Sequence, residues 1–160
     1  MRSIWILILG LMLSLVNIDA NAQPTEVQAK KLSGYFFSGS DAMLKDGPNC
    51  FVITKPQEFE KFFGKGRADT PHFSKEWMLV LIMPATKKDI QLEFNRISMK
   101  AGTFVEVYCD FNKLRGKMLT YETNPMAVCT IPRFEKVKTI NFYVERKKGL
   151  ELVTSVDVKR

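Results

Sequence analysis

Residues 90–111 read IQLEFNRISMKAGTFVEVYCDF, and this stretch decides the fold class. Apolar and polar residues alternate from Ile90 to Asn95, and the same period of two returns from Val105 to Phe111. Because successive side chains of a strand point to opposite faces, each half predicts a strand with one buried face. The pair Ala101-Gly102 supplies a turn signal, so we expect two adjacent antiparallel strands.

Further strand signals lie on both sides of this stretch. Trp77 to Met83 (WMLVLIM) is an unbroken apolar run of strand length, which predicts a central strand covered on both faces. The remaining strands are expected at residues 35–37, 50–54, 126–131, 139–145 and 150–156. The pattern predicts a mainly β domain (α+β by element count), a single antiparallel sandwich or roll of about seven or eight strands.

One short helix is expected within this β pattern. Thr54 is a candidate N-cap with Gln57 three residues later, as in a capping box, and Gly64 provides the stop signal. The aromatic residues Phe59, Phe62 and Phe63 fall on one face of this helix. At that spacing they are expected to pack into the core.

The N-terminus has the features of an export signal. A short basic segment, Met1 to Ser3, precedes an apolar run from Ile4 to Val16, which is shorter than the ~20 residues a membrane-spanning helix needs. Ala20-Asn21-Ala22 has the small residues of a signal peptidase site, so cleavage is expected between Ala22 and Gln23. The mature protein is therefore expected in the periplasm or outside the cell.

Composition supports a single exported globular domain. The chain has 160 residues, of which 46% are hydrophobic and 26% charged, and this balance argues against long disorder, collagen-like repeats and a multi-span membrane protein. We expect a signal peptide at 1–22, a flexible lead-in at 23–33 and one β-rich domain at 34–160. The mature chain has no second apolar stretch that resembles a transmembrane segment.

Four segments carry a resemblance to a known family. They are residues 51–63 (FVITKPQEFEKFF), 72–83 (HFSKEWMLVLIM), 90–111 and 124–133 (NPMAVCTIPR). Residues 51–132 resemble the C-terminal domain of the PrcB family, secreted proteins named after a subunit of a bacterial surface protease complex. The resemblance implies a β-rich secreted module that assembles with a protease or modulates it.

Catalytic and metal-binding motifs are missing from the sequence. It has no Gly-rich phosphate loop, no G-x-S-x-G and no H-E-x-x-H, and its single histidine, His72, stands in a loop after Pro71. We therefore predict no enzymatic activity, no metal site and no cofactor. The enzymatic alternative would need His72 to meet a thiol in space.

The three cysteines, Cys50, Cys109 and Cys129, are not arranged in the close pairs of structural zinc sites. In an oxidising compartment one disulfide with one thiol left over is the expected state. Cys109 and Cys129 lie on strands close in sequence and form the predicted pair. Three free buried thiols are the alternative.

The chain has 24 basic and 17 acidic residues, a net charge of +7, and eight of the basic residues gather in predicted loops. They are Lys87, Lys88, Lys113, Arg115, Lys117, Arg146, Lys147 and Lys148. These residues predict a rim that binds anions or an acidic partner, whereas the alternative is charge that only keeps the protein soluble. Nucleic acid is not an expected partner, because few aromatic residues are interleaved with the basic ones.

These observations favour an exported, non-enzymatic binding or accessory module. Its expected partner is another envelope or extracellular protein, with a secreted protease favoured by the resemblance. The alternative is a secreted proteinase inhibitor that presents residues 84–89 or 112–124 to an active-site cleft. The sequence leaves the oligomeric state open.

Overall fold

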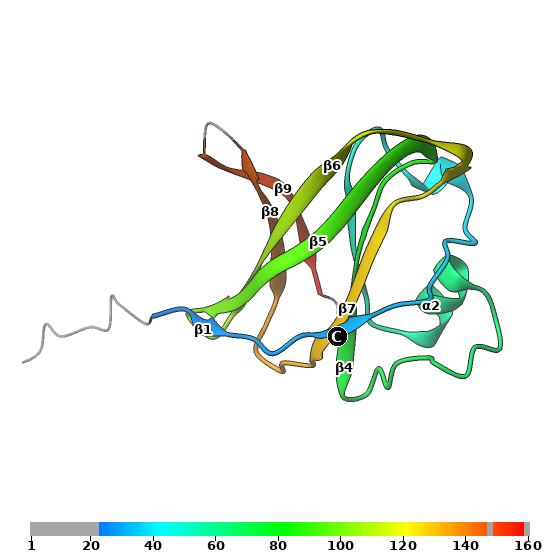
Figure 1. Ribbon diagram of the computed structural model, residues 1–160. Helices are drawn as coiled ribbons and strands as arrows, with labels where there is room; N and C mark the ends of the chain where they lie inside the picture. Colours follow the sequence, from blue (N-terminus) through cyan, green and yellow to red (C-terminus); the bar gives the residue numbers. More distant parts are fainter. Residues whose placement is uncertain (1–22, 147–148, 159–160) are drawn as a thin grey trace, which may run out of the picture.

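The computed structural model describes residues 23–146 and 149–158, with residues 112–117 described through their backbone only. Two open sheets pack as a sandwich (Figure 1). The five-stranded sheet has the spatial order β1 (Thr25–Glu26), β5 (Thr86–Lys100), β6 (Phe104–Thr123), β8 (Thr139–Arg146) and β9 (Gly149–Asp157). The four-stranded sheet has the order β2 (Lys30–Leu32), β7 (Met126–Pro132), β4 (Glu76–Ile82) and β3 (Asn49–Ile53). The predicted mainly β class and sandwich are confirmed.

Strand β4 lies in the middle of the four-stranded sheet and is covered on both faces, as its unbroken apolar sequence predicts. Trp77, Leu79 and Leu81 face the five-stranded sheet and belong to the main core between the sheets. The alternate residues Met78, Val80 and Ile82 belong to a second core on the other face. Since each of these six side chains is at most 4% exposed, β4 holds the two cores together.

The helix α2 (Pro56–Phe63) contributes three aromatic side chains to the second core. Phe59, Phe62 and Phe63 are all buried, as their helical spacing predicts. Residues 35–37, expected as a strand, instead run along this helix without joining a sheet. Their side chains explain the difference, because the Tyr35 ring packs edge-on against Phe59 and Phe63 and is held by the helix.

Strands β4 to β7 form one long, bent antiparallel ribbon that passes from one sheet into the other (Figure 1). The bend lies at residues 83–85 and 124–125, where Met83 N–H donates to the Pro125 carbonyl at 3.0 Å and the Asn124 amide donates to the Met83 carbonyl at 3.1 Å. The ribbon includes the predicted pair of strands in residues 90–111, which turns at Ala101 and Gly102. The main core lies inside this bend.

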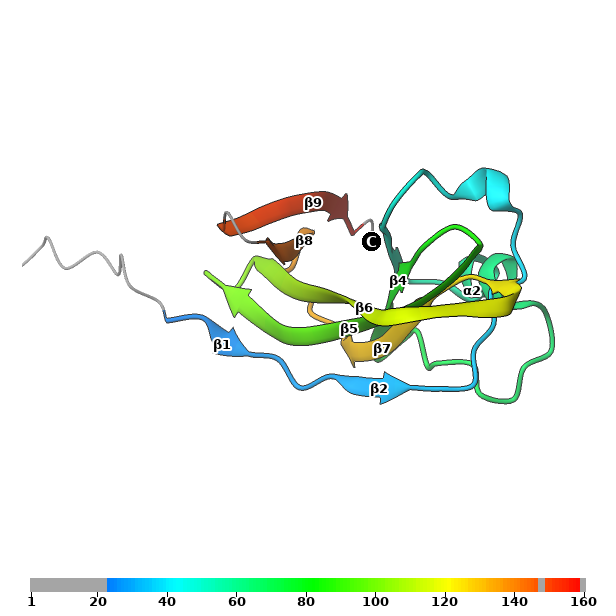
Figure 2. The same ribbon diagram turned by 45° about the horizontal axis from the view of Figure 1, so that its top comes forward.

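Two expectations about the sheets need correction. The segment 23–33, expected as a flexible lead-in, forms β1 on the edge of one sheet and β2 on the edge of the other (Figure 2). Val27, which lies between these two strands in the chain, is buried. Without this segment, β5 and β7 would be edge strands with unpaired backbone N–H and C=O groups, and β1 and β2 pair with them. In addition, β6 and β8 pair in parallel, because the intervening strand β7 belongs to the other sheet.

The start of α2 also differs from the predicted capping box. The Glu58 carboxylate, not the Gln57 side chain, accepts from the Thr54 backbone N–H at 2.9 Å and its hydroxyl at 3.3 Å. The N-cap position belongs to Lys55, which makes no side-chain capping bond, and Pro56 occupies the first turn. The helix starts one residue later than expected. The side chain that accepts from the backbone before the helix is therefore that of Glu58, one residue after Gln57. Gly64, with a φ of 84°, ends the helix as predicted.

Replacing Glu58 with alanine is expected to lower the free energy of unfolding by about 1 kcal/mol, because the Thr54 N–H and hydroxyl lose their acceptor. Urea denaturation followed by circular dichroism measures this change. Gln57→Ala is the matched control, since Gln57 is exposed in the adjacent position. A loss with Gln57→Ala as large as that with Glu58→Ala would contradict the assigned cap.

No helix in residues 23–146 or 149–158 is long and apolar enough to cross a membrane. The 3-10 helix η2 (Asp41–Met43) and α2 are both short. The predicted signal peptide, residues 1–22, lies outside the described residues, as do Lys147 and Lys148 of the predicted basic rim.

Candidate functional site

The two segments predicted as loops, 84–89 and 112–124, lie opposite each other in the ladder between β5 and β6. Thr86 pairs with Thr123, Lys88 with Met118 and Ile90 with Lys113. Five residues of β5 thus face eleven of β6, so the longer strand bulges between these pairs. We call residues 86–90 and 113–123 the ribbon end; Figure 1 shows it at the upper right.

The ribbon end collects five of the eight predicted basic residues. Lys87 and Lys88 are exposed on β5, and positions 113, 115 and 117 follow the opposite strand. These positions are expected to be loops because no regular alternation marks them. Their pairing depends on the neighbouring bend, which brings the chain after β4 alongside the chain before β7.

Two large apolar side chains of the ribbon end are exposed. Met118 is 68% exposed and Tyr121 is 65% exposed. Tyr121 is the one aromatic residue near the predicted basic loops, whereas Met118 was not singled out from the sequence because it stands in a polar segment without periodicity. Tyrosine and methionine are enriched in protein interfaces, and a tyrosine buries a large area at low conformational cost.

The end of β8 lies beside the base of the ribbon end. Arg146 lines a hollow of about 250 Å³ together with Ile90, Asp110 and Phe111. Arg146 forms an ion pair with Glu151 across the β8–β9 hairpin at 2.5 Å. The described part of the predicted basic rim is therefore gathered at one end of the sandwich.

A second group of cationic residues, at the other end of β4, was missed from the sequence. Lys55, Lys75, Arg133 and Lys136 line an open hollow of about 570 Å³. Its floor includes Trp77, which contacts Phe134 edge-on at 6.4 Å between ring centroids. These cations come from three separate segments and form no run in the sequence, so only the folded chain brings them together.

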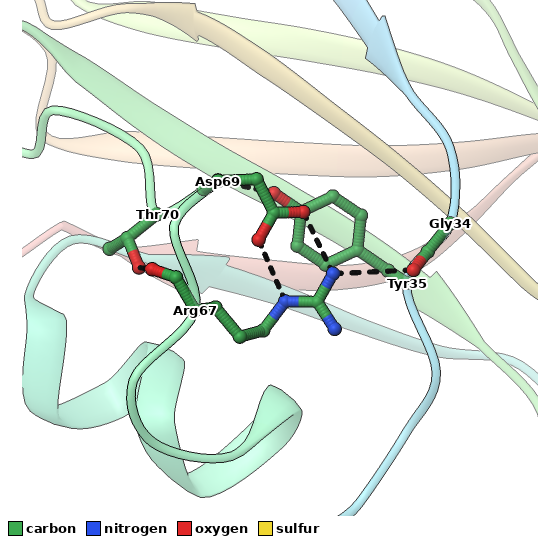
Figure 3. Close-up of polar contacts among 5 residues, drawn as sticks. All are labelled: Gly34, Tyr35, Arg67, Asp69 and Thr70. Carbon is green, nitrogen blue, oxygen red and sulfur yellow. Dashed lines mark hydrogen bonds and ion pairs between the residues drawn. The ribbon is translucent and has the colours of Figure 1, made fainter.

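The most connected polar cluster ties the loop before β4 to the segment before η2 (Figure 3). Arg67 donates two hydrogen bonds to the Asp69 carboxylate, at 2.8 and 2.7 Å, and a third to the Gly34 carbonyl at 3.3 Å. Its guanidinium lies 4.6 Å from the centre of the Tyr35 ring, whose hydroxyl donates to the Asp69 carbonyl at 2.6 Å. The Arg67 Nε and Nη2 donors and the Tyr35 hydroxyl are all used within the cluster or on backbone, so we assign it a structural role.

The Tyr35 cluster gives a testable pH dependence. Burial, followed by the nearby Asp69 carboxylate, raises the pKa of Tyr35 from 10.0 to about 12. As the pH rises from 10 to 12, the unfolded chain loses this proton before the folded chain does, so the free energy of unfolding falls over that range. The fall should be smaller in Tyr35→Phe and unchanged in Tyr121→Phe. An equal fall in all three proteins by urea titration would contradict this assignment.

The cysteines correct the predicted disulfide. Cys50, Cys109 and Cys129 are all free and buried. The thiol of Cys109 interacts by a hydrogen bond with Cys50 of β3, and more weakly, through electrostatics, with Cys129. The sequence distance between Cys109 and Cys129 is short, but β6 and β7 continue into different sheets, and the register instead places Leu79 opposite Cys129.

The folded protein should resist thiol alkylation. The hydrogen bond with Cys50, together with burial, raises the pKa of Cys109, and burial raises the pKa of Cys129 to about 12. At pH 8, iodoacetamide should therefore label none of the three cysteines in the native protein and all three in guanidinium, as counted by intact mass. Rapid labelling of Cys109 in the native state would contradict this expectation.

The histidine does not meet a thiol in this structure. His72 is exposed in the turn before β4, where its backbone N–H donates to the Glu76 carboxylate at 3.0 Å, whereas the three thiols lie in the main core. The described residues contain no group of three or more histidine, cysteine or acidic side chains placed to hold a metal ion.

Comparison with known proteins adds no relative. No family model, no characterised protein and no solved structure matches this chain.

Proposed function

We propose that this protein is an exported, non-enzymatic binding module that recognises another envelope or extracellular protein through the ribbon end. The observation that carries the proposal is the pairing of Lys88 with Met118, which puts exposed apolar and cationic side chains on one surface. Two separate sequence segments contribute to this surface. The export step rests on the predicted cleavage between Ala22 and Gln23.

The chemistry of the ribbon end favours an acidic partner surface. Lys87 and Lys88 are exposed beside Met118 and Tyr121, and the whole chain carries a net charge of +7. Exposed charges of one sign speed the encounter with an oppositely charged surface, while large apolar anchors slow dissociation. The two kinds of side chain therefore supply the two requirements of a specific interface.

A secreted protease is the partner class that we propose first. The resemblance of residues 51–132 to the PrcB C-terminal domain supports an accessory subunit of such an enzyme. The second candidate is a proteinase inhibitor, and the ribbon end favours it, because segments 84–89 and 112–124 converge there. Both candidates use the same surface and differ in what happens to the activity of the partner.

Site-specific photo-crosslinking tests the proposal. A photoreactive phenylalanine analogue at Tyr121 should give one defined adduct with an exported protein of the native organism. The same group at Phe104, 43% exposed at the other end of β5 and β6, should not. Equal adducts from both positions, or none from Tyr121, would overturn the assignment of the ribbon end.

The adduct also separates the two candidates. A crosslinked protease that keeps its activity would support the accessory subunit, and a silenced protease would support the inhibitor. A partner without protease activity would leave the binding surface assigned and exclude both protease roles.

A further inference from the structure

The hollow at the start of β4 combines a cationic rim with an apolar floor. Its volume of about 570 Å³ lies within the range typical of small-molecule sites. The floor is formed by Trp77, only 4% exposed, and Val137, also 4% exposed, with half-buried Phe134 and Val158 at its sides. The polar part of a ligand would therefore meet the rim while its apolar part covers these side chains.

The charge balance of the rim is positive. Lys55, Lys75, Arg133 and Lys136 line the hollow, and Glu135 is the acidic residue among its lining side chains. None of the ion pairs seen in residues 23–146 and 149–158 uses one of these four cations. Arg133 is additionally held in place, because its guanidinium donates to the Phe73 carbonyl at 3.4 Å and its backbone N–H to the Lys75 carbonyl at 2.8 Å.

Two further carboxylates close to the hollow in sequence are not part of its lining. Glu58 is engaged with Thr54 at the start of α2, and Glu76 accepts a hydrogen bond from the His72 backbone N–H. Because the lining holds four cations and one carboxylate, that of Glu135, an anion in the hollow would meet an excess of cationic side chains. At the edge of a low-dielectric floor, these cations attract an anion more strongly than they would in bulk water.

We propose that this hollow is a binding site for a small organic anion, a phosphate, sulfate or carboxylate ester or acid that carries an aromatic or aliphatic group. The anionic group lies among the four cations, and the apolar group covers Trp77 and Phe134. The site is independent of the ribbon end, because β4 separates them: Trp77 is the second residue of this strand and Met83 follows its end, about 20 Å away.

Trp77 provides a direct reporter for this site. The chain has two tryptophans, Trp5 and Trp77, so the full chain with Trp5→Phe has one indole signal. Phenyl phosphate is the probe because it carries both parts of the proposed ligand; inorganic phosphate and benzyl alcohol each carry one. We expect saturable shifts of the indole N–H resonance with phenyl phosphate at a Kd of about 1 mM or tighter, and weaker binding of the other two.

Charge-matched variants distinguish a site from general attraction to a basic protein. Lys55→Ala with Lys136→Ala should weaken phenyl phosphate binding about five- to tenfold. Lys61→Ala with Lys138→Ala removes the same charge from exposed neighbours outside the hollow and should change binding less than about twofold.

Three outcomes would overturn the proposal. They are the absence of any indole shift with phenyl phosphate, equal affinity for benzyl alcohol, and equal losses in the two double variants. Circular dichroism of each variant shows whether the fold is retained. Since all four replaced lysines are exposed, no loss of structure is expected. None of these results depends on the partner of the ribbon end, so the two proposals can fail separately.

Discussion

Replacing Phe59 with alanine is expected to lower the free energy of unfolding by about 3 to 5 kcal/mol. Phe59 is 1% exposed and its ring lies 5.1 Å from Phe63 and 6.0 Å from both Tyr35 and Phe73, measured between centroids. Its removal leaves a cavity where α2, the segment before η2 and the turn before β4 meet. Urea denaturation monitored by Trp77 fluorescence and by circular dichroism measures the loss.

The matched control for this prediction is Phe36→Ala. Phe36 neighbours the same aromatic layer in sequence but is 77% exposed, so its removal should change the free energy of unfolding by less than about 0.5 kcal/mol. Similar losses for Phe59→Ala and Phe36→Ala would show that the second core does not stabilise the fold as the burial indicates.

Replacing Met118 and Tyr121 together with alanine is expected to weaken partner binding about 100-fold or more, with little change in stability. Both side chains are exposed in the free protein, so their removal should change the free energy of unfolding little. At an interface, two central anchors of this size together contribute roughly 3 kcal/mol or more. Surface plasmon resonance with the partner identified by crosslinking measures the change, which should lie mainly in the dissociation rate.

Phe36→Ala with Phe104→Ala is the control for this interface prediction. It removes a comparable exposed apolar area away from the ribbon end and should leave the affinity within about twofold. Replacing Lys87 and Lys88 with alanine should mainly slow association, and this effect should shrink as the salt concentration rises. Loss of binding in the control pair, with retention in Met118→Ala and Tyr121→Ala, would place the interface elsewhere.

Elements with a local signature could be predicted without the structure. The alternation in 90–111 and the apolar run 77–83 each report burial directly, and both became the strands expected from them. The spacing of Phe59, Phe62 and Phe63 likewise predicted a buried helical face. In each case the period of the apolar residues within one strand or helix shows which of its faces is buried.

Elements that depend on a distant partner were predicted wrongly or missed. Residues 23–33 have no strand signature, yet they pair with both sheets because each sheet has an open edge beside them. Glu58 replaced Gln57 in the capping contact because Pro56 shifts the helix start. Cys109 contacts Cys50, since inter-sheet packing and not sequence separation decides which side chains meet in the core.

The candidate sites, too, were predicted in part from the sequence and in part only from the structure. The sequence alone identified the cationic residues of the ribbon end as a group, because they lie in short runs, and it determined the β-rich class, because burial on one face of a strand imposes a period of two. Only the tertiary structure joined segments 84–89 and 112–124 and assembled Lys55, Lys75, Arg133 and Lys136 around Trp77. Both assemblies follow from how β4 and β7 pair and then diverge into two sheets, which no local pattern of residues encodes.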